Sequence, residues 1–311
     1  MRVIFLGTPD FAVPSLHALA QQHEVLSVFT QPDRPKGRGG HVAQSPVKHA
    51  AIELGLTVHQ PERIRRPPAP ELLRDAGADI MVVVGYGQII PQSIIDLPRY
   101  GILNVHASLL PKYRGAAPIQ WAIANGERET GVTIMQINAG LDTGDMLLKS
   151  VLTIGADETA PELSARLAPL GAEALLETLR LMECGTAHAE KQDEAEASFA
   201  PILKKEDGLI DWELPAANIY NRLRGFAPWP GVYTHFRKQQ LLVWRARPTE
   251  NPSGAAPGRM ITDKRRLVVA CGDGTALEAI EVQLSGKSRM SGEAFVNGHH
   301  PRENESLGEL A

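Results

Sequence analysis

The sequence predicts an α/β protein in which a doubly wound, mainly parallel sheet is followed by a small β-barrel. The first observation is the length, because 311 residues exceed what one hydrophobic core usually serves and two domains are therefore expected. The second is an alternation, over the first two-thirds of the chain, of short apolar runs with amphipathic helical patterns, which is typical of parallel strands covered by helices. The third is a change beyond residue 205 to short strands separated by turns.

The strands of the first part are predicted where apolar, often β-branched residues run together between turn signals. Such continuous runs suit strands that are buried on both faces of a sheet. They are Val3–Leu6, Val25–Thr30, Ile80–Val84, Ile102–Val105 and Val132–Ile137.

Helices are predicted between these strands. Ser45-Pro46 combines an N-cap residue with proline at the first helical position, so a helix should run from there to Leu54. A short helix is expected over Pro118–Asn125 and a long one over Glu162–Met182.

A polar stretch over residues 190–205 predicts an exposed linker between a first domain, residues 1–189, and a second domain, residues 206–311. Gly-Asp-Gly at 272–274 is a strong turn signal within the second domain. The strands of this domain are expected at Gly231–Phe236, Gln240–Arg245, Gly258–Ile261, Leu267–Ala270 and Glu278–Gln283.

The formal net charge of −4 is unevenly distributed along the chain. Residues 1–205 carry 19 basic and 23 acidic side chains, a balance of −4, whereas residues 208–302 carry 13 and 8, a balance of +5. A mildly basic second part indicates a polyanionic partner such as nucleic acid.

Several classes of protein are disfavoured by composition. No apolar run approaches the roughly 20 residues that span a bilayer, and the apolar N-terminus is too short for a signal peptide. The two cysteines, Cys184 and Cys271, lie far apart and favour a reducing compartment. No Cys/His cluster or HxxxH pair predicts a metal site. We therefore expect a cytoplasmic protein without a metal or a membrane partner, and a monomer.

Three polar residues are candidates for catalysis. In a doubly wound sheet, ligands bind beyond the carboxyl ends of the strands. Asn104 and His106 lie two positions apart at the end of one predicted strand, so both side chains point to the same side. The glycine-flanked loop after the next strand presents Asp142. An amide donor, an imidazole and a carboxylate suit acyl transfer to an amine, because the oxyanion must be held and protons must move. Each residue could instead be a hydrogen-bonded structural group.

Two other enzyme classes lack their sequence signatures. Gly7-Thr8-Pro9 cannot form the glycine-rich turn that binds a dinucleotide, which disfavours an NAD-dependent oxidoreductase. Ser108 is not surrounded by the GxSxG sequence of a serine nucleophile, so we place it in ligand binding. The loop over Gly85–Pro91 could present backbone groups to a flat ligand.

These residues form a pattern that resembles the signature of folate-dependent formyltransferases, in the same order and spacing. The similarity extends over nearly the whole chain, through Gly7–Phe11, Gln31–Pro35, Ile210–Trp212 and Arg224–Gly231. Its central motifs are Asn104-x-His106, Ser108-Leu109-Leu110-Pro111 with Arg114-Gly115, and Gly140-Leu141-Asp142-Thr143-Gly144.

The resemblance implies transfer of a formyl group from 10-formyltetrahydrofolate, as co-substrate, to the α-amino group of initiator methionyl-tRNA. It also implies that the second domain is an OB-type barrel that helps to hold the tRNA. Asn104 and His106 would stabilise the oxyanion, and Asp142 would orient His106 and accept a proton. The folate pocket would be lined by Ser108, Leu109, Leu110, Pro111, Gln88, Ile89 and Ile90.

The glycine-rich segment 33–40 carries Arg34, Lys36 and Arg38, which could fold around tRNA phosphates. The alternative is an ordinary solvated loop. The second domain also offers candidate phosphate contacts, although each of them is more often an ordinary surface charge. They are Arg222, Arg224, Lys264, Arg265, Arg266, Lys287 and Arg289. Trp212 and Trp229 could stack on bases, but we expect both in the core.

Other functions remain open at this stage. A related enzyme could formylate another amine, such as an amino-sugar nucleotide, or hydrolyse formyltetrahydrofolate. A non-enzymatic RNA-binding protein is the alternative from a different class, and replacing His106 by alanine would separate it from an enzyme.

Overall fold

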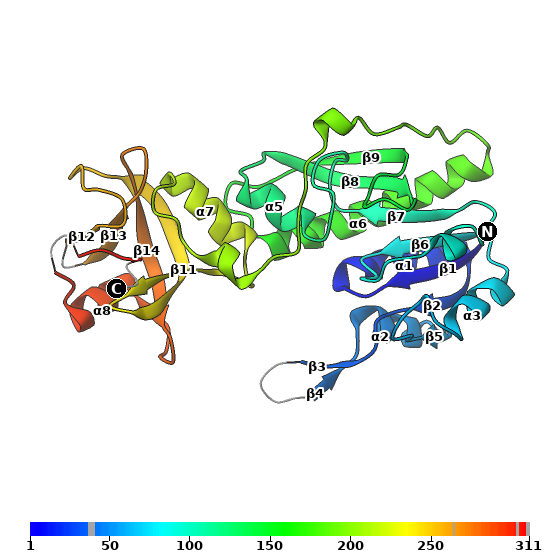
Figure 1. Cartoon of the computed structure of the whole chain (residues 1–311), viewed down its shortest axis with the longest axis horizontal. Helices are drawn as coiled ribbons and strands as arrows, with labels where there is room; N and C mark the ends of the chain where they lie inside the picture. Colours follow the sequence, from blue (N-terminus) through cyan, green and yellow to red (C-terminus); the bar gives the residue numbers. More distant parts are fainter. Residues whose placement is uncertain (37–40, 264, 303–304, 309–311) are drawn as a thin grey trace. The chain divides into compact units, whose positions relative to one another are not determined.

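The chain folds into two units, which are described separately. The computed structural model describes residues 1–36, 41–263, 265–302 and 305–308. Unit 1 comprises Met1–Pro118, Glu129–Thr153 and Leu163–Pro201, and unit 2 comprises Ile119–Arg128, Ile154–Glu162 and the described part of Ile202–Ala311 (Figure 1).

Unit 1 is built on a seven-stranded sheet in the order β5-β2-β1-β6-β7-β8-β9. The first five strands in this order are parallel, while β8 is antiparallel to both β7 and β9, so the prediction of a mainly parallel sheet is confirmed. The chain runs outward from β1 to β2 and then returns to β6 on the other side, which makes β1/β6 the switch point. The strands are β1 (Arg2–Gly7), β2 (Glu24–Phe29), β5 (Val58–His59), β6 (Ile80–Val84), β7 (Ile102–His106), β8 (Glu129–Gln136) and β9 (Met146–Thr153).

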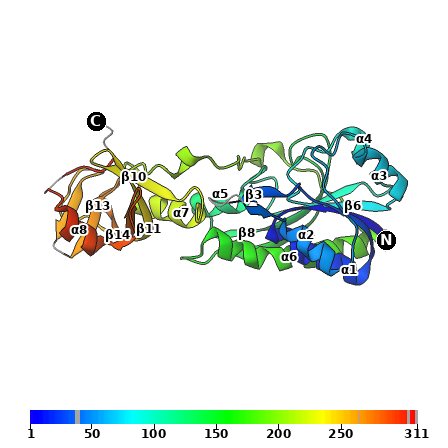
Figure 2. The ribbon, with the colours of Figure 1, turned by 90° about the horizontal axis from the view of Figure 1, so that it is seen from below.

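Helices cover both faces of this sheet, as a doubly wound fold requires. Figure 2 shows α1, α2 and α6 on one side and α3 and α4 on the other. Ser45 caps α2 as predicted, since its side chain accepts a hydrogen bond from the Lys48 N–H. The helices of this unit are α1 (Val13–Gln22), α2 (Pro46–Glu53), α3 (Ala69–Ala76), α4 (Gln92–Ile95) and most of α6 (Ala160–Glu183). The short helix α5 (Pro118–Ala124) belongs mostly to unit 2.

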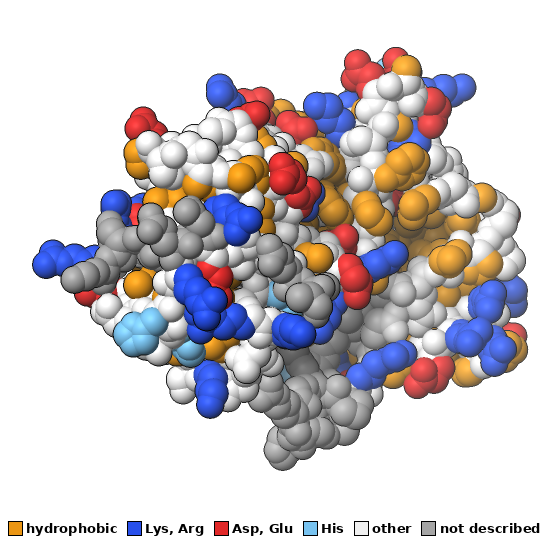
Figure 3. Space-filling model, turned by 60° about the vertical axis from the view of Figure 1, so that its left-hand side comes forward, with side chains coloured by type: hydrophobic (Ala, Val, Ile, Leu, Met, Phe, Trp, Pro, Cys, Tyr) orange, Lys and Arg blue, Asp and Glu red, His pale blue; other side chains and the backbone are white. Residues whose placement is uncertain are grey.

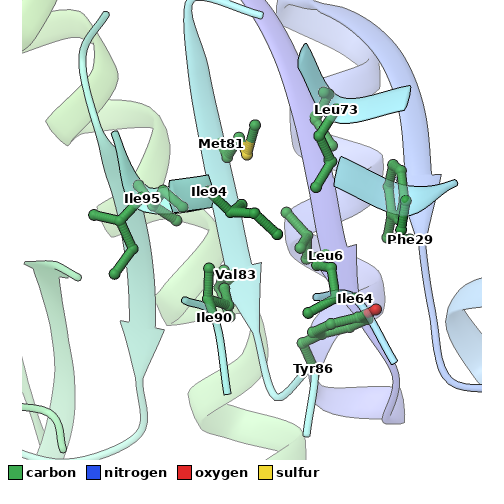
Figure 4. Packing of buried hydrophobic residues seen from close by; sticks show 13 residues of the cluster. Leu6, Phe29, Ile64, Leu73, Met81, Val83, Tyr86, Ile90, Ile94 and Ile95 are labelled. Atoms are coloured by element: carbon green, nitrogen blue, oxygen red, sulfur yellow. The ribbon is translucent and has the colours of Figure 1, made fainter. Parts of the chain in front are cut away.

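The core on the α3/α4 side shows why the apolar runs form central strands. Leu6 of β1 and Val83 of β6 point to this side and meet Leu73 of α3 and Ile94 of α4, all of them buried (Figure 4). Every residue of β6 is buried, so both faces of the strand contribute to the core. Burying such side chains supplies the main driving force for the fold.

Unit 2 contains an antiparallel sheet in the order β10-β11-β14-β13-β12, with β15 paired to β14. It curls into a half-barrel, consistent with the predicted OB-type domain (Figure 1). Buried and less buried residues alternate along β10, and Phe236 packs edge-to-face on Phe295 of α8 inside the unit. The elements are α7 (Ala216–Gly225), β10 (Val232–Phe236), β11 (Gln239–Glu250), β12 (Met260–Asp263), β13 (Arg266–Ala270), β14 (Thr275–Leu284), β15 (Met290–Ser291) and α8 (Gly292–His299).

Some segments differ from what the sequence pattern suggested. A hairpin of β3 (Arg34–Lys36) and β4 (His41–Ala43) was not predicted, nor was β9 at the edge of the main sheet. Residues 190–201 belong to unit 1, and α5 belongs mostly to unit 2. The domain boundaries at residues 189 and 205 stay predictions.

Candidate active site

The three predicted catalytic residues lie together at the carboxyl end of β7. Asn104 and His106 are on the same side of the strand, and Asp142 comes from the loop between β8 and β9. The Asn104 amide nitrogen lies 3.5 Å from Oδ1 of Asp142. Nδ1 of His106 lies 3.8 Å from Oδ2 of the same carboxylate. The structure therefore brings together the amide, imidazole and carboxylate that the sequence analysis singled out.

His106 is almost completely buried, and both ring nitrogens have a neighbour. Nε2 lies 3.0 Å from the carbonyl oxygen of Tyr113. Because a carbonyl can only accept, Nε2 must carry a hydrogen and donate it. Nδ1 is left facing the carboxylate of Asp142.

Asp142 has a backbone φ of 51°, in the left-handed region that non-glycine residues rarely occupy. Its Oδ2 accepts a hydrogen bond of 2.8 Å from the backbone N–H of Gly115. The side chain is 17% exposed, so the carboxylate is only partly screened by water. Asp142 thus has a structural role, because it accepts the Gly115 N–H within the loop, and its carboxylate also faces His106. A structural role and a catalytic role are therefore compatible for this residue.

The turn after β7 is held by its own polar groups. The Ser108 hydroxyl donates to the carbonyl of Lys112 at 2.6 Å, and Thr133 links to both the carbonyl of Ser108 and the N–H of Leu110. The Leu110 side chain is buried with Met135 and Met146. The side chains of Ser108 and Leu110 therefore shape the turn, and contact with a ligand there would be made by the remaining surface of the turn.

The second predicted ligand loop, residues 88–90, follows β6. The Gln88 side chain accepts from the N–H of Ile64 at 2.7 Å and donates to the carbonyl of Pro61 at 3.0 Å. Ile90 is buried in the core, whereas Ile89 is 92% exposed. Gln88 and Ile90 thus fix the loop, and Ile89 presents its side chain outward.

A polar network that sequence analysis missed anchors the base of the β3/β4 hairpin. Asp33 forms an ion pair with Lys48 at 2.5 Å and accepts from the Gln60 amide at 2.7 Å. The hydrogen bond from Lys48 lowers the pKa of the Asp33 carboxyl. The neighbouring Arg34 is 70% exposed and lies 3.9 Å from Glu62. The position of Asp33 after the end of β2 was the only sign of this network in the sequence. Its partners Lys48 and Gln60 lie 15 and 27 residues further along the chain, so the sequence did not reveal the pairing.

The basic residues predicted to bind tRNA have different surroundings. Lys36 is in β3, while Arg38 and Lys264 lie outside the described residues. Arg222 is partly exposed on α7. Arg224 is only 6% exposed, and its guanidinium donates to the carbonyls of Gly155 and Glu158. Both terminal nitrogens of Arg224 are therefore used within unit 2, which disfavours the predicted phosphate contact.

The two tryptophans also differ. Trp212 is buried and donates to the hydroxyl of Thr234 at 3.2 Å, as expected for a core residue. Trp229 is 56% exposed, so the expectation that it is in the core is wrong. The described residues contain no group of three or more potential metal-ligating side chains and no helix long and apolar enough to cross a membrane.

Comparison with known protein families identifies the chain as a formyltransferase. The model of the formyl transferase family matches residues 1–179, and that of the formyl transferase C-terminal domain matches residues 202–300. The chain belongs to this family.

Relatives within the family are similar over their full length. The methionyl-tRNA formyltransferase of Solibacter usitatus is 59% identical over 310 residues, which is 99% of each chain. That of Koribacter versatilis is 53% identical over 313 residues, covering 100% of both. Within the formyl transferases, the chain groups with the methionyl-tRNA formyltransferases.

A solved structure shows the same fold at lower similarity. It is the N-formyltransferase of Helicobacter canadensis in complex with folinic acid and dTDP-3-aminofucose. The TM-score is 0.68 at 20% identity, with 89% of this chain and 98% of that chain covered.

Proposed function

We propose that the protein transfers the formyl group of 10-formyltetrahydrofolate to the α-amino group of initiator methionyl-tRNA, giving N-formylmethionyl-tRNA for translation initiation. The observation that carries the proposal is the convergence of Asn104, His106 and Asp142 at the carboxyl end of β7. Full-length relatives named methionyl-tRNA formyltransferase support the choice of acceptor.

The chemistry follows from these three groups. The amine nitrogen attacks the formyl carbon, and the carbonyl electrons move to oxygen, where the Asn104 amide and His106 stabilise the negative charge. The amine loses a proton to Asp142, directly or through water, beside Nδ1 of His106. The bond to N10 of the folate then breaks, and N10 takes up a proton, so no net proton is gained or lost. No covalent enzyme intermediate is needed, since the amine is itself the nucleophile.

For the formyl donor, we propose a folate pocket between the turn Ser108–Pro111 and the loop Gln88–Ile90. Both segments follow strands that are neighbours in the sheet, β7 and β6. Both segments are fixed by hydrogen bonds to the surrounding protein, through Gln88 in the loop and through Ser108 and Leu110 in the turn, so they can present a rigid surface to a flat ring. The complex of the Helicobacter canadensis enzyme with folinic acid supports a folate donor.

For the tRNA, we propose phosphate contacts by Arg34, Lys36 and Arg38 of the β3/β4 segment and by Arg222 of α7. The network of Asp33, described above, would support the start of the hairpin. Lys and Arg side chains are also spread over the face of the molecule in Figure 3. We further propose catalysis by residues 1–189 and tRNA binding by residues 206–311, in a cytoplasmic monomer.

The test is a formylation assay with four acceptors: initiator methionyl-tRNA, elongator methionyl-tRNA, free methionine and an amino-sugar nucleotide. We expect the initiator species to have the highest kcat/KM. Replacing His106 by alanine should lower kcat/KM by roughly 10²–10⁴-fold, the usual range for a general acid–base group. The exposed His188 of the same unit provides a matched control, and His188→Ala should keep wild-type activity. A better turnover of free methionine or of the sugar nucleotide would refute the tRNA assignment.

A further inference from the structure

The segment predicted as a linker contains a strap that is hydrogen-bonded across unit 1, which we define as residues 190–200. At one end, Glu190 and Met146 of β9 exchange two backbone hydrogen bonds of 2.8 Å. At the other end, Arg114 donates its N–H to the carbonyl of Ser198 at 2.8 Å and accepts from the N–H of Ala200 at 2.7 Å. The strap is therefore fixed at both ends, on the turn after β7 and on β9.

Between these anchors the strap surrounds a buried arginine. The Arg114 side chain is 2% exposed, and its terminal nitrogens form two bonds of 2.8 Å with the carboxylate of Glu194. Its Nε donates to Oε1 of Gln192 at 2.9 Å. The hydrogen bonds to Glu194 raise the pKa of the Arg114 guanidinium, which stays charged.

Gln192 connects this arginine to the catalytic loop. Its amide nitrogen donates to the carbonyl oxygens of Asp142 and Gly144, both at 2.8 Å. The orientation of the amide is determined by Arg114, which can only donate, so the oxygen of Gln192 faces the guanidinium and the NH₂ faces the loop. One side chain thus holds two carbonyls of the loop in which Asp142 adopts its left-handed conformation.

The strap also supports the other neighbours of His106. The Ser198 hydroxyl accepts from the N–H of Tyr113 at 2.9 Å, and the carbonyl of Tyr113 is the partner of His106 Nε2. A Cβ at Gly115 would lie 2.6 Å from the carbonyl oxygen of Ala200, so the strap leaves room only for glycine there. Gly115 in turn donates its N–H to Asp142.

We propose that Gln192 is a positioning residue of the active site, through which the strap and Arg114 hold Asp142 against His106 and Asn104. It acts through Asp142 and contacts no reacting atom, and the proposal rests on the proposed function. Glutamine is suited to this place because it is both an acceptor for the arginine and a donor to two carbonyls. Glutamate has the same shape but lacks both donors.

The experiment compares Gln192→Glu and Gln192→Met with wild type, using Glu196→Gln as a control at an exposed position of the same strap. We expect kcat to fall roughly 10- to 100-fold in both Gln192 variants, since a small misplacement of a catalytic group has effects of this size. KM for tRNA and folate should change by less than about threefold, because uniform binding is not affected. Glu196→Gln should match wild type.

A double-mutant cycle tests whether Gln192 acts through Asp142. In an Asp142→Asn background, adding Gln192→Glu should lower kcat by less than about twofold, since the group being positioned has already lost its charge. A readout without substrate is amide hydrogen exchange, where residues 140–145 should exchange about tenfold faster in Gln192→Glu, with α2 unchanged.

The outcomes separate the two proposals. If wild type fails to formylate methionyl-tRNA, the proposed function is refuted, and hydrogen exchange still tests the role of the strap. If wild type is active and both Gln192 variants keep its kcat, the positioning role is refuted. It is equally refuted if the losses of Gln192→Glu and Asp142→Asn are fully additive, or if the exchange of residues 140–145 is unchanged.

Discussion

Replacing Arg224 by methionine should destabilise unit 2 without affecting tRNA binding. In the structure the guanidinium donates to the carbonyls of Gly155 and Glu158, at 3.2 and 2.8 Å, and to the side chain of Asn221 at 2.7 Å. It also lies 5.5 Å from the ring centre of Tyr220. Burial lowers the pKa of Arg224, as expected for a cation withdrawn from water. The residue thus connects α7 with residues 155–158 of the same unit.

The size of the effect follows from these contacts. Hydrogen bonds from a charged donor contribute about 1.5–3 kcal/mol each, before the exposure of the acceptors is considered. Gly155 is exposed, so its carbonyl can bind water once the guanidinium is gone. Methionine also fills part of the volume that the arginine chain occupied. We therefore expect a loss of about 2–3 kcal/mol in the free energy of unfolding.

The assay is urea unfolding combined with the salt dependence of tRNA binding, and Arg222→Met on the same helix serves as the matched variant. Arg222→Met should leave stability nearly unchanged and reduce the slope of log K against log salt by about one, as expected for the loss of one phosphate contact. Arg224→Met should lower the free energy of unfolding and leave the salt slope of tRNA binding unchanged. Unchanged stability together with a reduced salt slope in Arg224→Met would refute the structural role that we assign to Arg224.

Three further predictions concern other parts of the chain. Ser45→Ala should lower the free energy of unfolding by about 1 kcal/mol in urea titrations, because the cap of α2 is lost. The hydrogen bonds from Arg237 lower the pKa of the Glu305 carboxyl below its ordinary value of 4.5. Their contribution to stability is therefore fully present above pH 4.5 and is lost as the pH falls through the lowered pKa. Arg237→Met should remove this contribution, so the urea midpoint should depend less steeply on pH in the acid range. Burial raises the pKa of the Cys271 thiol to about 12, while Cys184 is exposed, so a thiol reagent should label one cysteine in native protein and two in urea.

The parts of the fold that sequence predicted well are those with a local signal. β6 was predicted with its observed ends, since five consecutive apolar residues leave little choice for a central strand. The start of α2 followed from Ser45-Pro46, where both residues act on the first turn of the helix itself. β9 was missed because it is an edge strand whose burial alternates, and its polar positions hid the pattern.

For the active site, strand periodicity was enough to place Asn104 and His106 on one side of β7. It could not show that Asp142 would be held in a left-handed conformation, because its supports come from residues 115 and 192. The strap carries an exposed glutamate, Glu194, and its polar composition resembles that of a solvated linker. The feature that distinguishes it, a buried arginine 80 residues earlier in the chain, is a tertiary contact.

The different burial of Arg222 and Arg224 also depends on tertiary contacts that the sequence does not reveal. The two residues are separated by two positions on α7, so they lie on different sides of the helix. Sequence alone does not tell which side faces protein. The neighbouring Gly225 supplies the answer in the structure, since a Cβ there would lie 2.6 Å from the carbonyl oxygen of Gln120 in α5. The end of α7 is therefore packed against α5 within unit 2, where Arg224 finds its partners inside the protein, whereas Arg222 on another side of the helix is partly exposed.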